Sequence, residues 1–305
     1  MKIERRRLLG GLAALPVLTS ARLAENDVPP QPIQAIGRKR IPRTGEPLPM
    51  IGLGTSRTFD EDPGAENPGL VQVMSDFLAW GGSLIDSSPM YRRAEAMTGE
   101  LLRRVERNDA FFATKVWTNE GREAGIAQME RSEQLMGTER FDLLQVHNLV
   151  GLETHLETLK EWKASGRVRY VGVTEMRNFA KVEELIASGA IDFVQVPYSL
   201  AERQVESRVL PAALDHGVAV LVMRPFQRGG LFKAMGDRPL PEWAGEVGCR
   251  SWAQVFLKFL LGHPAVTCPI PATSKPHHLA DNMAAGVGPL PDESWRKRAL
   301  ALLEG

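Results

Sequence analysis

Four residues of this chain carry the side chains that a proton-transfer site requires: Asp86, Tyr91, Lys115 and His147. A carbonyl group that accepts a hydride gathers negative charge on its oxygen, which then needs a proton from a nearby acid. Tyrosine is a weak acid with an ordinary pKa of about 10. Because a neighbouring ammonium stabilises tyrosinate, we expect Lys115 to lower the pKa of Tyr91 and make it a useful proton donor.

The other two residues complete this arrangement. A buried Lys115 ammonium needs a counter-charge, and Asp86 can supply it. His147 can orient the substrate oxygen by donating a hydrogen bond, or it can exchange the proton itself. Ordinary roles stay open for each residue, such as helix capping by Asp86 or backbone hydrogen bonding by His147. Their joint position at three successive predicted strand ends favours the catalytic interpretation.

Eight short apolar runs bounded by turn residues predict parallel strands that are buried on both faces. Helical patterns lie between them, such as the spacing of Leu152, Leu156 and Leu159. We therefore predict the α/β class and a (β/α)8 TIM barrel, in which function gathers at the carboxyl ends of the strands. An open doubly wound sheet is the alternative, but Gly52-x-Gly54 lacks the third glycine of its nucleotide-binding turn. The predicted strands are residues 51–54, 83–87, 111–116, 143–147, 170–174, 193–196, 219–223 and 267–270.

Other local signals agree with this barrel. Residues 38–46 predict an N-terminal β-hairpin, with its turn at Thr44-Gly45, that plugs the bottom of the barrel. Gly166, Gly189 and Gly217 follow predicted helices, where a left-handed residue closes the last turn. We expect long insertions after the fourth and seventh strands.

The N-terminus differs from the rest of the chain. Residues 5–7 are arginines and residues 8–18 are almost all apolar, which is typical of an export signal. A helix over the apolar run rises only about 16 Å, too short for a stable membrane span. Arg5-Arg6-x-Leu8-Leu9 resembles a bacterial twin-arginine signal, which the export machinery reads as an address.

The N-terminal pattern also sets the predicted domain boundaries. We predict a signal peptide over residues 1–24, a proline-containing linker over residues 25–36, and the barrel over residues 37–305. The expected location is periplasmic or exported, or cytoplasmic if the N-terminal interpretation is wrong.

Composition narrows the class of partner. The chain has 305 residues, with Lys+Arg and Asp+Glu at 37 each. No net positive field therefore attracts nucleic acid, and a small molecule is the expected partner. Cys249 and Cys268 are the only cysteines and lie far apart in sequence, so neither a disulfide framework nor a metal site is indicated.

Four segments resemble the aldo-keto reductase family in order and context: Gly52-Leu53-Gly54-Thr55, Leu84-Ile85-Asp86-Ser87-Ser88-Pro89-Met90-Tyr91, Ala113-Thr114-Lys115-Val116 and Leu143-Leu144-Gln145-Val146-His147. The resemblance runs through essentially the whole of the predicted mature chain. It implies a barrel that binds NADPH across its mouth, uses no metal, and reduces aldehydes or ketones with the tetrad Asp86, Tyr91, Lys115 and His147.

The resemblance also implies a cofactor site. Thr273, Ser274 and Lys275 lie in a segment similar to the one that holds the adenosine phosphate in this family, just before a helix start that favours anions. The same comparison assigns a further set of residues to cofactor contacts: Gly54, Thr55, Asp86, Thr174, Gln195, Met223, Arg224, His278 and Asn282.

Several positions depart from the family pattern, and all of them fall on cofactor contacts. His278 stands where many members have arginine, and Ala272 stands at a lysine position, so NADH use is not excluded. Thr174-Glu175 replaces a Ser-Asn pair, which leaves Gln195 as the expected partner of the nicotinamide carboxamide. Met223 stands where many relatives have an aromatic residue, and its sulfur can still pack on the ring.

Two other functions stay open at this point. The barrel could bind nucleotide as a redox sensor or regulatory subunit, or it could be an exported barrel that binds a small ligand. The loops that shape the substrate pocket carry no motif, so the sequence predicts no particular carbonyl compound.

Overall fold

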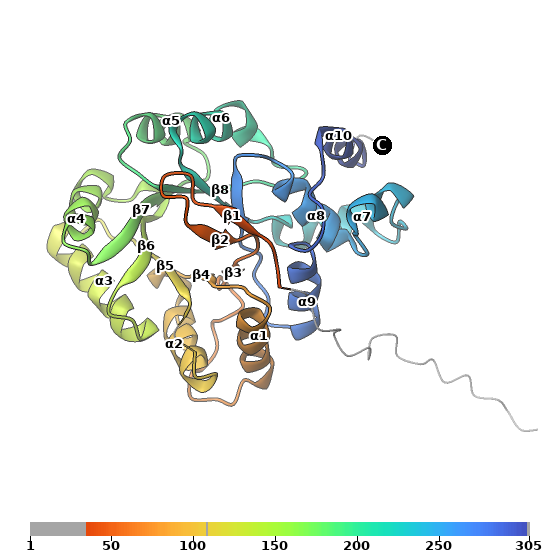
Figure 1. Ribbon diagram of the computed structural model, residues 1–305. Coiled ribbons are helices and arrows are strands. Elements are labelled where there is room, and N and C mark those ends of the chain that lie inside the picture. The colour runs from red at the N-terminus through yellow and green to blue at the C-terminus, as the bar shows by residue number, and fades with distance from the viewer. Residues whose placement is uncertain (1–34, 108, 304–305) are drawn as a thin grey trace, which may run out of the picture. The chain divides into compact units, whose positions relative to one another are not determined.

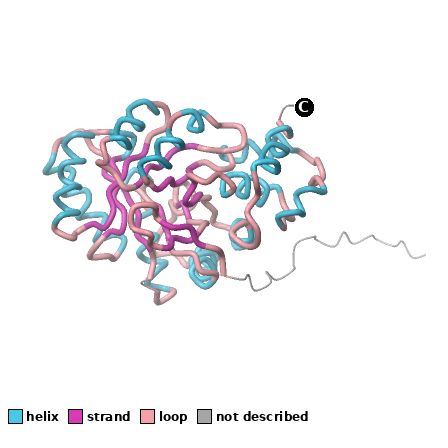
Figure 2. Tube along the Cα trace, turned by 45° about the horizontal axis from the view of Figure 1, so that its top comes forward, coloured by secondary structure: helices cyan, strands magenta, loops and turns pink. Residues whose placement is uncertain are grey.

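Eight parallel strands form the centre of the fold. The computed structural model describes residues 35–107 and 109–303, and within them each strand pairs with the next along the chain. Helices alternate with the strands and surround them (Figure 1 and Figure 2). The arrangement matches the predicted (β/α)8 fold. The strands are β3 (Leu53–Gly54), β4 (Leu84–Asp86), β5 (Phe111–Val116), β6 (Phe141–Val146), β7 (Val168–Thr174), β8 (Phe193–Pro197), β9 (Ala219–Met223) and β10 (Val266–Pro269).

The first and last strands meet along a lightly bonded seam. The Gly52 amide donates to the Pro269 carbonyl at 3.0 Å, and the Gly54 amide donates to Pro271 at 3.2 Å. An isolated parallel bridge joins Gly54 to Ala272. A Cβ on Gly54 would lie 2.7 Å from the Ile270 carbonyl oxygen, so only glycine allows this approach. We call this contact the β3–β10 seam.

The helices follow the predicted alternation, and each barrel helix packs apolar side chains on the strands. Gly166, Gly189 and Gly217 have φ values of 80°, 70° and 64°, as expected after a helix end. The helices are α1 (Pro68–Ala79), α2 (Ala94–Arg104), α3 (Arg122–Met136), α4 (Leu152–Ala164), α5 (Phe179–Ala187), α6 (Val209–His216), α7 (Gly230–Met235), α8 (Trp252–Leu261), α9 (Pro276–Ala284) and α10 (Glu293–Ala301), with short 3₁₀ helices η1 (Pro89–Tyr91), η2 (His147–Leu149), η3 (Gln204–Ser207), η4 (Gln227–Gly229) and η5 (Glu242–Val247).

One of the two predicted insertions is present. After β9 the chain forms η4, α7 and η5 before it reaches α8, which confirms the insertion after the seventh strand. The insertion predicted after the fourth strand is wrong. α4 begins at Leu152, because the leucines at helical spacing that follow β6 already belong to the barrel helix.

A hairpin closes the amino-terminal end of the barrel. Its strands β1 (Arg38–Arg40) and β2 (Pro47–Pro49) are antiparallel, and Figure 1 shows them lying across the ring. Gly45 has a φ of 74° in the turn, as the sequence predicted, and the second strand begins just after the predicted segment. Ile41 and Leu48 are at most 1% exposed and join the cluster that fills the barrel interior.

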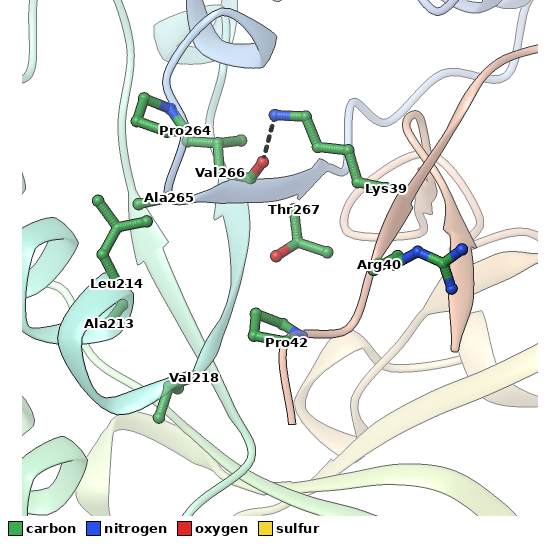
Figure 3. Close-up of a pocket in the computed structure, with 10 residues that line it drawn as sticks. All are labelled: Lys39, Arg40, Pro42, Ala213, Leu214, Val218, Pro264, Ala265, Val266 and Thr267. Atoms are coloured by element: carbon green, nitrogen blue, oxygen red, sulfur yellow. Dashed lines mark hydrogen bonds between the residues drawn. The ribbon is translucent and has the colours of Figure 1, made fainter. Parts of the chain in front are cut away.

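A cavity of about 270 Å³ lies at this same end, between the hairpin, α6 and β10 (Figure 3). Lys39 reaches it and donates to the Val266 carbonyl at 2.6 Å and the Leu261 carbonyl at 2.7 Å. Burial lowers the pKa of Lys39 to about 8. These carbonyls already accept hydrogen bonds from the Lys39 ammonium, and the carboxyl ends of the barrel strands lie at the opposite end of the barrel. This cavity is therefore not the candidate active site.

The predictions made for residues 1–34 lie outside the described residues. Ile36, the last residue of the predicted linker, is 5% exposed, and its amide donates to the Trp80 carbonyl at 3.2 Å. Ile36 therefore packs against the barrel, and the linker predicted over residues 25–36 does not extend to this residue. Within residues 35–107 and 109–303, no helix is long and apolar enough to cross a membrane.

Candidate active site

A fully buried ion pair lies near the carboxyl ends of β4 and β5. The Lys115 Nζ lies 2.7 Å from the Asp86 Oδ2 and also donates to the Ser87 carbonyl at 2.6 Å. Burial lowers the pKa of Lys115, but the charge of Asp86, its hydrogen bond to Lys115 and the charges of Tyr91 and Glu95 together outweigh burial, so the pKa is raised. Lys115 is therefore a fixed positive charge inside the barrel mouth.

Two glutamines complete the surroundings of the Asp86 carboxylate. Gln195 Nε2 on β8 donates to Oδ2 at 3.0 Å, and Gln145 Nε2 on β6 donates to Oδ1 at 3.2 Å. Both glutamines are at most 1% exposed. Together with Lys115, they hold the carboxylate by donors from three strands, so its orientation is tightly defined.

Tyr91 ends the short helix η1, which follows β4. The Ser88 hydroxyl caps this helix by accepting the Met90 amide hydrogen at 3.2 Å. The Lys115 Nζ lies 5.2 Å from the centroid of the Tyr91 ring. Burial raises the pKa of Tyr91, and the Lys115 charge offsets this only in part, so the net direction is upward. The expectation of a lowered Tyr91 pKa is therefore wrong for the free protein, because burial outweighs the lysine.

His147 follows β6 and faces Tyr91. The two ring centroids are 5.9 Å apart with the planes perpendicular. The His147 Nδ1 lies 3.0 Å from the Ser88 hydroxyl. Burial, followed by the charge of Lys115, lowers the pKa of His147 to about 3, so the imidazole is neutral at ordinary pH.

The residues predicted to contact a cofactor fall into two groups around the same mouth. The first lies on β3, β7, β8 and β9. The buried Thr55 hydroxyl donates to the Asp86 carbonyl at 3.0 Å, next to Gly54 at the β3–β10 seam. Thr174 ends β7 and accepts the Asn148 amide hydrogen at 3.0 Å. Met223 ends β9 and is half-buried, as is Arg224 after it.

The second group follows β10. Thr273 is buried and its hydroxyl accepts the Lys275 amide hydrogen at 3.1 Å, while Ser274 and Lys275 are exposed before α9. His278 and Asn282 are one turn apart on α9, so they share a face of that helix. Asn282 is 4% exposed, and its side chain has no hydrogen bond within the described residues.

The unusual Glu175 has a local role. Its Oε1 accepts the backbone amide hydrogens of Met176 and Arg177 at 2.7 and 2.8 Å. The carboxylate therefore stabilises the turn after β7, which explains why an acidic residue fits there.

Sequence reasoning missed Gln145 and Ser88 as parts of the site. Gln145 is two residues before His147, so period-two alternation would have put both side chains on one face of the strand. Ser88 stands inside the motif that identified Tyr91, but its contact with His147 joins segments 59 residues apart. That contact has no local signal.

The fold and these contacts define the class of protein as a parallel β/α barrel with a buried lysine–carboxylate pair beside a tyrosine and a histidine. The sequence model of the Aldo/keto reductase family matches residues 50–299. The chain belongs to the aldo/keto reductase family.

Two curated proteins illustrate the sequence similarity. Aldo-keto reductase YhdN of Bacillus subtilis is 29% identical over 65% of this chain and 64% of its own length. The NADH-specific methylglyoxal reductase of Escherichia coli is 25% identical over 49% of this chain and 54% of its own. The matched regions therefore span less than two thirds of either protein.

A solved structure shows the same fold. The aldo/keto reductase of Klebsiella pneumoniae, in complex with NADP and acetate, has a TM-score of 0.73 and 22% identity. The alignment covers 89% of this chain and 96% of that one.

Proposed function

We propose that this protein reduces aldehyde or ketone carbonyls with NADPH, with Tyr91 as the general acid. The observation that carries the proposal is the completely buried Lys115–Asp86 pair, 2.7 Å apart, beside the Tyr91 ring. Burying two charges is costly, and a fold that needed only stability would gain as much from apolar side chains. Such a pair at the carboxyl ends of barrel strands therefore favours a catalytic use.

The chain's own residues fit the proposed cofactor. The Gln195 Oε1 is buried and has no hydrogen-bond partner among the described residues, which suits the amide hydrogens of a nicotinamide carboxamide. The Asn282 side chain is 4% exposed and has no hydrogen bond among the described residues, so it is free to bond a base edge. Bound NADPH would supply the hydride. The adenosine phosphate would be held by Thr273, Ser274 and Lys275. The rest of the cofactor site would be lined by Gly54, Thr55, Thr174, Met223 and Arg224.

Both nicotinamide cofactors have support among relatives. The Klebsiella structure contains NADP, and the Escherichia coli relative is named as specific for NADH. Lys275 favours the extra phosphate of NADPH, whereas His278 and Ala272 provide less positive charge than the family pattern, so we propose NADPH as the main cofactor with NADH also accepted.

The proton steps follow from the charges in the site. Tyr91 keeps its proton in the free protein because burial raises its pKa. The Lys115 ammonium then stabilises the tyrosinate that forms when Tyr91 gives its proton to the substrate oxygen. Asp86 keeps Lys115 charged throughout, so the lysine is a fixed electrostatic stabiliser.

His147 orients the substrate oxygen. Its neutral imidazole carries one proton, and the Ser88 hydroxyl already accepts the Met90 amide hydrogen. The hydroxyl hydrogen is then free to point at the His147 Nδ1, which leaves the proton on Nε2. The Nε2–H is the donor that this arrangement offers to a carbonyl oxygen.

The test compares the wild type with Tyr91→Phe. We expect NADPH oxidation with a panel of aldehydes, ketones and quinones, and a loss of at least about 100-fold in the variant. Binding of NADPH, followed by protein fluorescence, should be unchanged because the phenol does not hold the cofactor. Turnover by neither protein while NADPH still binds would favour the sensor or regulatory function. A protein that does not bind NADPH would favour the exported ligand-binding barrel.

We also propose export through the N-terminal signal, on the basis of Arg5-Arg6 and the short apolar run after them. The twin-arginine route carries folded cargo, so a cofactor acquired before transport would travel with the protein. A fusion of residues 1–36 to a reporter that is active only after export tests this. The double substitution Arg5→Lys and Arg6→Lys in this fusion should abolish export of the reporter. Equal export of the unchanged fusion and the substituted fusion would contradict the proposal.

A further inference from the structure

A second buried carboxylate lies on the outer side of the strand that carries Lys115. Glu95 on α2 is 2% exposed, and no step of the proposed reaction uses it. Its Oε1 accepts the Thr114 hydroxyl hydrogen at 2.6 Å, and the Ser132 hydroxyl on α3 lies 3.1 Å from its Oε2. Both hydroxyl side chains belong to residues that are at most 1% exposed. We call Glu95, Thr114 and Ser132 the Glu95 cluster.

The strand β5 separates the Glu95 cluster from the inside of the barrel. Successive side chains of a strand point to opposite faces. Ala113 belongs to the cluster that fills the barrel interior, whereas Phe112 belongs to the outer core that contains the helix side chains. Thr114 therefore faces outward, toward the neighbouring helices α2 and α3, and Lys115 faces inward (Figure 1). Glu95 thus approaches Lys115 from behind the strand.

Stability alone does not explain a charge at this position. Among residues 35–107 and 109–303, Glu95 forms no ion pair. Glu100 on the same helix shows the contrast, because Arg103 and Arg104 lie 2.7 and 2.6 Å from its carboxylate. A buried carboxylate without such a partner costs more than an apolar side chain would. Buried charges of this kind are candidates for a role in function.

The charges of two side chains on neighbouring elements reach Glu95: those of Lys115 on β5 and Arg131 on α3. Of the other elements that pack on α2, α1 carries one charged residue, Asp76, close to its carboxyl end, and η1 carries the Tyr91 phenol. Burial raises the pKa of Glu95, and its two hydroxyl partners and the two cations offset this rise only in part.

Glu95 acts on the same lysine that would stabilise tyrosinate. Burial lowers the pKa of Lys115, and the charges of Asp86, Tyr91 and Glu95, with the hydrogen bond to Asp86, raise it. A negative charge behind Lys115 also offsets part of the positive potential that the ammonium exerts on the phenol. Lys115 can then stabilise the tyrosinate that forms during the reaction without removing the Tyr91 proton from the resting protein.

We propose that Glu95 is a positioning residue for carbonyl reduction, which acts through Lys115 and opposes the loss of the Tyr91 proton in the resting protein. Its role in catalysis rests on the proposed function, whereas its effect on the Tyr91 proton does not. Even strongly buried glutamates become ionised at about pH 8 to 9, below the range in which tyrosine titrates. Glu95 therefore carries its charge when Tyr91 loses its proton.

Glu95→Gln removes this charge with little change in shape. The new amide oxygen can accept the Thr114 hydroxyl hydrogen, and the amide nitrogen can donate to Ser132, whose own hydrogen then bonds the Gln128 carbonyl at 3.1 Å. The chain has three tyrosines, so labelling tyrosine with ¹³C at the ring carbon that bears the hydroxyl gives three resonances, and Tyr91→Phe assigns one. We expect the acid dissociation constant of Tyr91 to rise about 3- to 10-fold in Glu95→Gln.

Two further variants separate the charge from the packing. Glu123→Gln makes the same change at an exposed position of α3, where water and salt screen the charge, and it should leave the Tyr91 constant unchanged. Thr114→Val removes the hydrogen bond to β5 but keeps the carboxylate, so it should also leave the constant unchanged. No rise in Glu95→Gln, or an equal rise in Thr114→Val, would overturn the inference.

The linkage can also be measured from the other end if Glu95→Gln does not fold. Lys115→Met should raise the pKa of the Glu95 carboxyl, followed by its ¹³C resonance, because two linked groups affect each other equally. An unchanged value would overturn the inference.

The reaction gives the matching kinetic test. With an uncharged aldehyde, the alkaline fall of kcat/KM should begin at lower pH in Glu95→Gln than in the wild type, by the same factor as the Tyr91 constant. Resonance titration requires no turnover, so its outcome is separate from that of the Tyr91→Phe test. A raised Tyr91 constant in a protein that reduces no carbonyl would contradict only the proposed function.

Discussion

Tyr91 and His147 face each other across the mouth, and burial keeps both in their neutral forms. Burial raises the pKa of Tyr91, which is an acid that becomes negative. It lowers the pKa of His147, a base that becomes positive, to about 3. A neutral phenol and a neutral imidazole are both hydrogen-bond donors, so under the proposed function the site would present two donors to one carbonyl oxygen.

The pH profile of carbonyl reduction should reflect these neutral forms. We expect kcat/KM to be flat from about pH 6 to about pH 9, because His147 is already deprotonated and Tyr91 is still protonated across that range. The rate should fall only at higher pH, as Tyr91 loses its proton. The measurement is kcat/KM with an uncharged aldehyde in constant-ionic-strength buffers. An inflection near pH 6.5 that His147→Asn removes would show that His147 titrates instead.

Cofactor choice should depend on pH through His278. Burial and then the charges of His277 and Lys275 lower the pKa of His278, against the opposite effect of Asp281. The imidazole is therefore neutral near pH 7 and gains charge as the pH falls below the ordinary value of about 6.5. We expect the affinity for 2′,5′-ADP relative to 5′-AMP to rise in that acidic range.

The control for this prediction is His278→Arg, which keeps a positive charge at every pH. Titration of the ligand phosphate is the same for both proteins, so the difference between their profiles reports His278 alone. Identical profiles would mean that His278 does not contact the extra phosphate.

At the scale of the element, strands with continuous apolar runs were predictable, and short contacts between distant segments were not. All eight predicted strands are present because parallel strands buried on both faces require such runs. β3 is only Leu53–Gly54, shorter than predicted, because it pairs at the β3–β10 seam through isolated bonds. The sequence pattern around Leu53 contains no information about that partner.

The residues of the candidate site also separate into those that the sequence pattern predicted and those whose contacts appear only in the folded chain. Asp86, Lys115 and His147 were found because each marks a strand end, where polar residues interrupt an apolar run. Gln145 and the Asp86 carboxylate belong to different strands, β6 and β4, and only the folded sheet brings them within 3.2 Å. The net rise in the Tyr91 pKa was also beyond prediction, because it depends on how deeply the folded loops bury the ring.

The hairpin β1–β2 should stabilise the barrel without taking part in its chemistry. Ile41 is fully buried against the interior cluster, so Ile41→Ala should lower the free energy of unfolding by about 2 to 5 kcal/mol. Urea unfolding measures this change. Leu214→Ala is the control, because Leu214 is 49% exposed and should lose far less. Equal losses for both variants, or a changed KM for the aldehyde in Ile41→Ala, would contradict a purely structural plug.

For the whole molecule, the β3–β10 seam is where folding and cofactor binding should be coupled. The proposed contacts Gly54 and Thr55 lie on one side of this seam, and Thr273 to Lys275 lie on the other. A dinucleotide held by both sides would link strands that otherwise share few backbone bonds. A ligand that binds only the folded state stabilises it, by about 2.7 kcal/mol when the free ligand concentration is 100 times its dissociation constant.

Hydrogen exchange measured by mass spectrometry can locate this stabilisation. With saturating NADPH we expect slower exchange in peptides that contain the Gly52 and Gly54 amides, because their bonds to Pro269 and Pro271 open less often. Peptides from β6, which is paired along both edges, should change little. If NADPH binds and β6 gains as much protection as the seam, the cofactor stabilises the barrel evenly and the coupling does not run through the seam.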